Sequence, residues 1–140
     1  MLFSIKSEKL DKFSFMEKFC ISIISLCLAL GGVTHIFDNV YFGLLPYKFA
    51  PNWVNLYWTS LGVIDFLAIY ILLKNRNLGI VLTLIIMISD VVINSAAYYS
   101  MQVIKDPIAL QLQTLFLGFC LGACMWLWKS NSSNSVSPVT

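Results

Sequence analysis

Long apolar runs separated by short polar stretches organise this sequence. Four runs stand out, and they cover residues 17–38, 54–73, 78–99 and 108–128. Each run has about the 20 residues that a helix needs to cross the hydrocarbon core of a bilayer. Only helices and closed barrels satisfy their backbone in lipid, and barrel strands are shorter and alternate. The runs therefore predict four membrane-spanning helices.

The prolines agree with this division, since they lie between the runs or outside them, at positions 46, 51, 107 and 138. In the segment KDPIALQL, Asp106 is predicted to cap a helix that has Pro107 in its first turn. The pattern predicts an all-α, integral membrane four-helix bundle. We expect a single domain over residues 1–128 and a disordered polar tail over 129–140.

The composition supports a chain that is mostly dissolved in lipid. Hydrophobic residues make up 59% and charged residues 11% of the 140 residues, whereas soluble domains are about half apolar and a quarter charged. The net charge of +2 is small and no basic patch is present, so nucleic acid is not an expected partner. Phosphate-binding glycine loops, H-E-x-x-H and G-x-S-x-G are missing. We expect no cofactor, and whether the protein is an enzyme stays open.

The basic residues predict an orientation. Seven of the nine lie in the N-terminal segment, the KNRN turn at 74–77 and the start of the C-terminal tail, and Lys48 and Lys105 lie on the opposite side. The positive-inside rule then places both termini in the cytoplasm. The mixed Phe/Lys segment 1–15 is expected along the inner interface. The first run follows lysines as a signal peptide would, but its length and the missing A-x-A site favour a retained helix. A bacterial inner (plasma) membrane is favoured, or the endoplasmic reticulum if the source is eukaryotic.

A few ionisable groups fall within these apolar runs. Asp38, Asp65 and Asp90 lie within or at the edge of a run, with no Lys or Arg beside them, and the only histidine, His35, lies one turn before Asp38. At about 1.5 Å per residue, these groups are predicted to share the half of the bilayer away from the termini. Acids are costly in lipid and normally face the bundle interior.

Steps of three and four residues place small and polar side chains on one stripe of each helix. The predicted stripes are Cys27, Gly31, Thr34 and Asp38 with His35 at its edge; Trp58, Gly62 and Asp65; Thr83, Met87, Asp90, Asn94 and Ala97; and Gln111, Thr114, Gly118 and Gly122. Such stripes either hold helices together or line a functional pocket. Three acids and a histidine exceed what helix packing requires, which favours a pocket. The predicted ligand-binding residues are His35, Asp38, Trp58, Asp65, Asp90, Asn94 and Gln111.

The loop after the first run, YFGLLPYKFAPNWVNLYW, is rich in aromatic residues. For Trp53 and Tyr57 we favour an interfacial belt. The loop could also fold down as a lid over the pocket, joined by Tyr98 and Tyr99. Aromatic walls with a few acids suit a lipophilic cation, or a lipid-like molecule with one polar end.

Cysteines and glycines mark the remaining packing features. The four cysteines, at positions 20, 27, 120 and 124, form no C-x-x-C motif and are predicted to pack rather than to bind a metal. Cys120 and Cys124 lie nearly opposite the motif Gly118-x-x-x-Gly122 on their helix. This close-packing motif either seats the fourth helix in the bundle or forms a homodimer.

The segment THIFDNVYFGLLP followed by PNW resembles the first helix and loop of the EXPERA proteins. These include the emopamil-binding sterol isomerases and the sigma-2 receptor type. The resemblance touches His35, Asp38, Pro46 and Trp53. It implies four helices around a pocket for sterols and amines, with Asp65 and Asp90 as pocket acids. The chain is short and lacks the glutamates expected on the later helices, so the resemblance implies binding and not turnover. A bacterial four-helix membrane family without an assigned activity is the alternative match.

Three functions are compatible with this pattern. The first is binding of a lipophilic sterol-, lipid- or amine-like ligand in an acidic intramembrane pocket that opens to the outer side. The second is proton- or cation-coupled transport, in which buried acids can act. The third is an interaction subunit, in which polar stripes contact another membrane protein.

Overall fold

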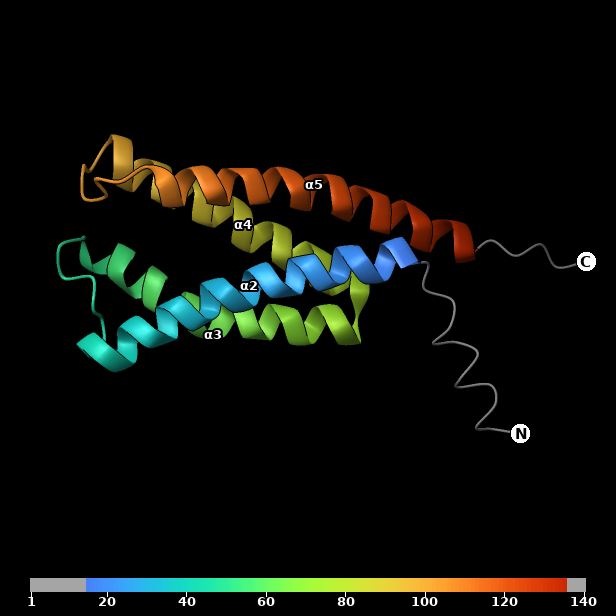
Figure 1. Cartoon of the computed structure of the whole chain (residues 1–140), viewed down its shortest axis with the longest axis horizontal. Helices are drawn as coiled ribbons and strands as arrows, with labels where there is room; N and C mark the ends of the chain where they lie inside the picture. Colours follow the sequence, from blue (N-terminus) through green and yellow to red (C-terminus); the bar gives the residue numbers. More distant parts are fainter. Residues whose placement is uncertain (1–14, 136–140) are drawn as a thin grey trace, which may run out of the picture.

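The computed structural model describes residues 15–135, with side chains described as far as residue 129. These residues form four helices and no strand, as Figure 1 shows: α2 (Phe15–Phe42), α3 (Asn52–Lys74), α4 (Arg76–Tyr99) and α5 (Ile108–Ser135). All four are long and apolar enough to cross a membrane. The prediction of an all-α chain with four helices that could each span a membrane is confirmed. The segment expected along the inner interface lies almost entirely outside the described residues.

The helices extend slightly beyond the apolar runs, and α5 differs most from its predicted bounds. It continues to Ser135, although the apolar, membrane-compatible part ends at Lys129. Residues 129–135 are thus helical where the sequence predicts the start of a disordered tail. No proline interrupts this part of the chain, and a polar helix end can extend into water at little cost. At the start of α5 the predicted cap is present, since Asp106 Oδ1 accepts a hydrogen bond from the backbone N–H of Ile108 at 2.9 Å.

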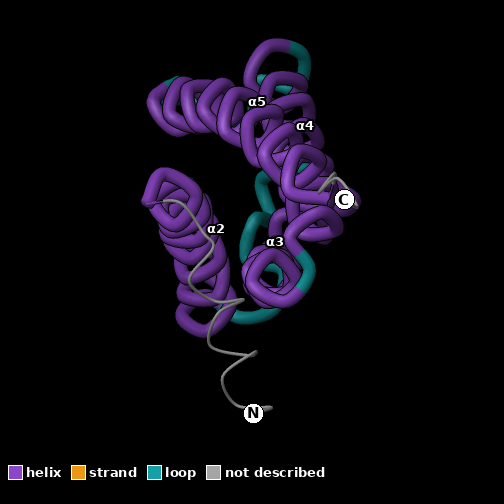
Figure 2. Tube along the Cα trace, turned by 90° about the vertical axis from the view of Figure 1, so that its right-hand side faces the viewer, coloured by secondary structure: helices purple, strands orange, loops and turns teal. Residues whose placement is uncertain are grey.

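Successive helices run in opposite directions along the molecule (Figure 1). The start of α2, the α3–α4 turn and the end of α5 share one end, called here the terminal end. The opposite end carries the connections 43–51 and 100–107 and is called the loop end. α2 packs on α3, α3 on α4 and α4 on α5, while α2 and α5 meet over a much shorter stretch. Figure 2 shows the result as an open arc of helices.

One residue, Asn75, connects α3 to α4. Its backbone N–H bonds to Ile71 at 2.7 Å and closes α3, while its side-chain oxygen accepts from the N–H of Leu78 at 3.2 Å and caps α4. Gly79 makes this turn possible, because a Cβ at this position would lie 2.1 Å from the Cα of Leu72. The two helices are therefore in close contact directly after the turn.

The molecule buries one face of each helix and exposes large apolar side chains elsewhere. Leu26, Val63, Leu115 and Met125 are each at least 60% exposed. Exposure of this kind is unusual for a protein in water and typical of a surface that contacts another apolar phase. It agrees with the four candidate membrane spans.

The predicted inward stripes hold on two helices and need correction on the other two. On α3 and α4, every residue of the predicted stripes is buried. On α2, Thr34 is exposed and bonds to its own helix through Leu30 O and Gly31 O. The buried face is displaced by one position and consists of Glu17, Cys20, Ile24, Leu28 and Gly32. On α2, therefore, the face that turns inward is determined by the packing of apolar side chains and not by the positions of the small and polar residues.

The correction on α5 is larger. The stripe of Gln111, Thr114, Gly118 and Gly122 is exposed, and nothing within the described structure lies within 4 Å of a Cβ built on either glycine. The face turned inward carries larger apolar side chains and both cysteines, namely Leu110, Cys120, Ala123, Cys124 and Leu127. These residues fill more space between helices than glycine does, and their burial removes more apolar surface from lipid or water.

Candidate functional site

Three side chains meet at the loop end around the hydroxyl of Tyr47. Tyr47 donates to Asp38 Oδ2 at 2.8 Å, and the same hydroxyl lies 2.8 Å from His35 Nδ1. Because the phenol has a single proton and gives it to Asp38, His35 Nδ1 must be the donor in the second bond. His35 and Asp38, predicted to interact directly, are thus joined through a loop residue.

The surroundings of Tyr47 favour its neutral form. Burial, then the hydrogen bond to Asp38 and the charge of that carboxyl group, raise the pKa of Tyr47 well above its ordinary value. The phenol therefore stays protonated at any physiological pH. It is a permanent donor to Asp38 and leaves the second oxygen of Asp38 available to another group.

The loop is held down on α3 by Asn55, which sequence analysis did not single out. The buried Asn55 side chain accepts from the backbone N–H of Tyr47 at 3.1 Å and donates to Leu45 O at 3.0 Å. Leu45 has a positive φ of 57°, a strained conformation for a leucine, which these bonds stabilise. The loop is a folded cover over the end of α3, in the manner of the lid considered from sequence.

Aromatic rings connect this cover to the bundle interior. The ring of Tyr47 lies edge-on to Trp58, with centroids 5.2 Å apart, and Phe49 lies 6.2 Å from the same Trp58. Beside them is a cavity of about 330 Å³, lined by Asp38, Phe42, Pro46, Tyr47 and Phe49. The cavity combines one carboxylate with aromatic walls.

A second polar group lies deeper, and Asn94 is at its centre. Asn94 Oδ1 accepts from Trp58 Nε1 at 2.7 Å, and its Nδ2 donates to Asp90 Oδ1 at 3.1 Å and to Gln113 Oε1 at 2.7 Å. These bonds join α3, α4 and α5 through one side chain. Trp58 belongs to both groups, since its ring touches Tyr47 and its N–H reaches Asn94. The two groups form one continuous set of contacts from the loop end into the bundle.

Asp65 lies next to this network without being bonded to it. Its side chain is 5% exposed, and Oδ2 lies 3.0 Å from the point that a Cβ on Gly31 would occupy. The carboxyl groups of Asp65 and Asp90 are close enough to interact electrostatically. The described part of the chain gives the Asp65 carboxyl no hydrogen-bond partner. Its carboxyl group therefore lies against α2 at Gly31 and lacks a polar partner there.

None of these acids has a basic partner within residues 15–129. Asp38, Asp65 and Asp90 form no ion pair with a lysine or arginine there, and Asp90 is only 8% exposed. A buried carboxylate without a countercharge is costly, which applies to Asp65 and Asp90, whereas Asp38 is only partly buried and is bonded to Tyr47. Among the described residues, no group of three or more His, Cys, Asp or Glu side chains is arranged to hold a metal ion.

Five of the seven predicted site residues thus share one set of contacts, from His35 and Asp38 through Trp58 to Asn94 and Asp90, and Asp65 lies beside them without a bond. Gln111 lies apart from them, because it is exposed and lines a separate cavity of about 950 Å³ together with Tyr98 and Tyr99. Gln113, rather than Gln111, accepts the hydrogen bond from Asn94. Side chains two residues apart on a helix point about 200° apart, so Gln111 and Gln113 lie on nearly opposite faces of α5.

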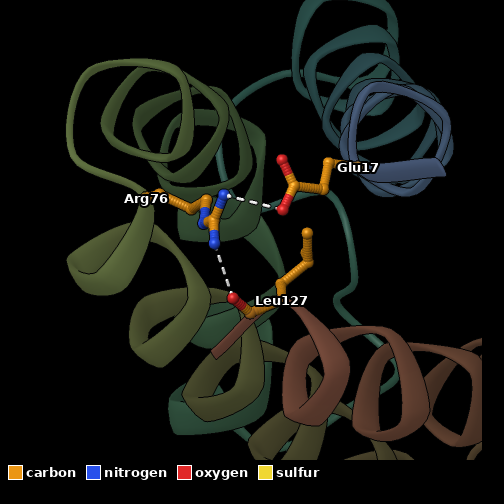
Figure 3. A network of polar contacts seen from close by, with 3 residues as sticks. All are labelled: Glu17, Arg76 and Leu127. Atoms are coloured by element: carbon orange, nitrogen blue, oxygen red, sulfur yellow. Dashed lines mark hydrogen bonds and ion pairs between the residues drawn. The ribbon is translucent and has the colours of Figure 1, made fainter. Parts of the chain in front are cut away.

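The structure also contains a buried ion pair that sequence analysis missed. Glu17, near the start of α2, is 2% exposed, and its Oε1 lies 3.6 Å from Arg76 Nη1. Arg76 Nη2 donates to Leu127 O at 2.6 Å, as Figure 3 shows. The contacts connect α2, α4 and α5 at the terminal end. Their sequence signal was weak, because each residue lies at the boundary of an apolar run.

The cysteines are free thiols distributed between α2 and α5. Cys20, Cys120 and Cys124 are buried in the core, and Cys27 is partly buried. They face the space between the two helices and, with Leu127, fill it. This arrangement agrees with the packing role expected from their spacing.

Comparison with known proteins finds no matching family model, no matching curated protein and no matching solved structure. The resemblance to the EXPERA proteins stays an expectation based on the residues quoted above.

Proposed function

We propose that this protein binds a lipophilic molecule with one cationic or polar end between its helices, through a site open toward the loop end. The observation that carries the proposal is the set of three acids, Asp38, Asp65 and Asp90, which lie in candidate membrane spans and have no lysine or arginine partner within residues 15–129. A bound cation would supply the missing charge. The apolar helices around the acids would receive the rest of the ligand.

The chemistry at Asp38 makes an amine the preferred ligand class over a neutral sterol or lipid. One Asp38 oxygen is bonded to Tyr47, and the aromatic rings of Phe42, Tyr47 and Phe49 line the same cavity. Carboxylates and aromatic faces both attract ammonium groups. Trp58 continues the aromatic surface inward, toward Asp90. An amine with a long apolar tail would fit this sequence of contacts.

We further infer that both termini are cytoplasmic and that the loop end, with the site, faces the outside. The support is the excess of lysine and arginine at the terminal end. A plasma membrane of a bacterium is the favoured location. Labelling of single introduced cysteines in intact cells, in a background without the native cysteines, tests this orientation.

Binding can be tested on the purified full chain in detergent, with dodecyldimethylamine as the probe and dodecanol as its uncharged equivalent. We expect the amine to raise the melting temperature of the wild type and dodecanol to have little effect. Asp38→Asn and Asp90→Asn remove the charge and keep the shape, and each is expected to abolish the amine-dependent shift. Normal shifts in both variants, or equal shifts with amine and alcohol, would contradict the proposal.

Asp106→Asn is the matched control for these substitutions. Asp106 is exposed and caps α5, and asparagine is an equally good cap. This variant changes the charge of the chain by the same amount and should bind the amine like the wild type. Circular dichroism of each variant shows whether a lost shift reflects a lost fold.

A second candidate is favoured by one observation on α5. Its exposed stripe of Gln111, Thr114, Gly118 and Gly122 has the composition of a helix-packing face but no partner helix within the described residues. We infer as the alternative an interaction subunit or homodimer that uses this face. Cross-linking of a cysteine introduced at Gly118 in native membranes tests it, and the same cysteine at Met125 is the control.

A further inference from the structure

A second cavity lies at the terminal end, far from the acids. It measures about 510 Å³ and lies among α2, α3 and α4. Its lining includes Lys18 and Ser22 from α2, Leu72 and Lys74 from α3, and Arg76 from α4. Three cationic side chains from three helices thus surround one space.

Positive charge exceeds negative charge at this cavity. Glu17 is the acid that contacts the lining, through Arg76. Within residues 15–129, no carboxylate lies within ion-pair distance of Lys18 or Lys74. The ammonium group of Lys74 lies 5.1 Å from the centre of the Tyr70 ring, a cation–π arrangement that leaves its hydrogen-bond donors free to bind an anion.

Arg76 is held in place, whereas the lysines are exposed. Its contacts with Glu17 and with Leu127 O fix the guanidinium group between three helices (Figure 3). A fixed arginine with two exposed lysines and the hydroxyl of Ser22 in the same cavity is a suitable environment for a phosphate group. Hydrogen-bond donors from α2, α3 and α4 thus line one cavity.

The position of the cavity indicates the source of that phosphate. Lys18, Lys74 and Arg76 lie at the ends of helices long and apolar enough to cross a membrane, and the ends of a spanning helix reach the lipid headgroups. The remaining lining is apolar and consists of Ile21, the buried Leu72 and the exposed Leu73. Basic pockets between membrane helices are suited to anionic lipid headgroups.

We propose that this cavity binds the headgroup of an anionic phospholipid. The phosphate contacts Lys18, Lys74 and Arg76, and the acyl chains lie against the apolar wall. Free inorganic phosphate would satisfy the cations but would leave that wall uncovered. The site is separate from the proposed amine site, because it lies at the opposite end of the helices.

The test uses the full chain in dodecyl maltoside and counts bound lipids by native mass spectrometry. The probes are palmitoyl-oleoyl phosphatidylglycerol, which is anionic, and palmitoyl-oleoyl phosphatidylcholine, which is zwitterionic. We expect the wild type to retain the anionic lipid preferentially. The variant Lys18→Gln/Lys74→Gln should bind it about 20- to 30-fold more weakly, since each basic residue near an anionic surface contributes about fivefold.

The matched control is Lys48→Gln/Lys105→Gln, which removes two lysines at the loop end. It should leave the binding of the anionic lipid at the wild-type level. Equal weakening in both double variants, or equal binding of the two lipids by the wild type, would overturn the proposal. Displacement of the lipid by millimolar inorganic phosphate would assign the cavity to a free anion and would also overturn it. If the double variant does not extract as a folded protein, the single variants, each expected to bind about fivefold more weakly, decide the question.

Discussion

At the scale of single residues, Tyr47 determines how the loop end is organised. Its hydroxyl joins Asp38 to His35, its backbone is bonded to Asn55, and its ring packs against Trp58. A loop side chain thus connects the polar residues of α2 with the interior of α3. Its loss should affect both stability and binding.

Tyr47→Phe keeps the ring and removes the hydroxyl. We expect the free energy of unfolding, measured by denaturant titration in detergent, to fall by about 1–2 kcal/mol, because Asp38 and His35 lose a shared partner. Tyr41→Phe is the control, since Tyr41 is 72% exposed and its ring stacks on Phe37 at the helix surface. Equal losses in the two variants would show that the bridge does not contribute.

The cost of Tyr47→Phe should also depend on pH. The pKa of Tyr47 is raised in the folded state by burial and by Asp38, so the folded protein holds this proton more tightly than the unfolded chain does. The unfolded chain is expected to have the ordinary tyrosine pKa of about 10. The stability that the Tyr47 proton contributes is therefore complete below about pH 10 and is lost as the pH rises toward the pKa of Tyr47 in the folded protein. The difference between wild type and variant should therefore be constant below pH 10 and shrink above it. A difference that grows above pH 10 would contradict this assignment.

Gln113 and Gln111 provide a comparison within one helix. Gln113→Ala removes the acceptor for Asn94 Nδ2 and leaves a buried donor unsatisfied, which should cost about 1–3 kcal/mol of unfolding free energy. Gln111→Ala changes an exposed residue and should stay within about 0.5 kcal/mol of the wild type. The reverse order would mean that α5 is rotated relative to the arrangement described here.

At the scale of elements, the sequence is sufficient to predict the four helices and their alternating directions. It does not predict which face of α2 or α5 packs against the neighbouring helices. Run length and proline positions are sufficient to predict four spans, because in lipid a helix is the simplest way to satisfy the backbone. Facing depends on which side chains fill the space between neighbours. On α3 and α4 the polar and small residues coincide with the packing face. On α5 they do not, since Cys120, Cys124 and Leu127 pack inward and the glycines face out.

Substitution of a crowded glycine, Gly79, and of an uncrowded one, Gly118, tests which helix faces are packed. Gly79→Ala would place a Cβ 2.1 Å from backbone of Leu72, so the α3–α4 contact must open, at a cost of at least about 2 kcal/mol. Gly118→Ala meets nothing within 4 Å and should be neutral or stabilise the monomer by up to about 1 kcal/mol through helix propensity. Thermal unfolding of both variants in detergent measures the difference. A large loss in Gly118→Ala would show that another helix covers this face.

At the scale of the whole molecule, the open arc of helices is closed at only one end. α2 and α5 meet over a short stretch, and Glu17 and Arg76 connect α2 with α4 and α5 there. Sequence reasoning singled out His35, Asp38, Trp58, Asp90 and Asn94, which share one set of contacts, because polar groups in apolar runs are conspicuous, and their binding of a ligand stays a prediction. It missed Glu17–Arg76, Asn55 and the bridging role of Tyr47, since such contacts depend on how loops and helix ends fold back.

The ion pair should determine the stability of the terminal end. Glu17→Gln or Arg76→Gln leaves the other charge buried, and each should lower the unfolding free energy by about 3 kcal/mol. The double variant should lose less than the sum of the two single variants, because both charges are removed. A double-mutant cycle in detergent measures the coupling, with Lys48→Gln as a surface control. Purely additive losses would show that the pair does not act as a unit.

The one-residue connection at Asn75 also has a consequence for biogenesis. Because one residue joins α3 to α4, we expect the polypeptide from Asn52 to Tyr99 to enter a bilayer as a helical hairpin. We therefore expect ribosome-bound chains to integrate these two segments in a single step. Lengthening the junction with a flexible insert should uncouple them.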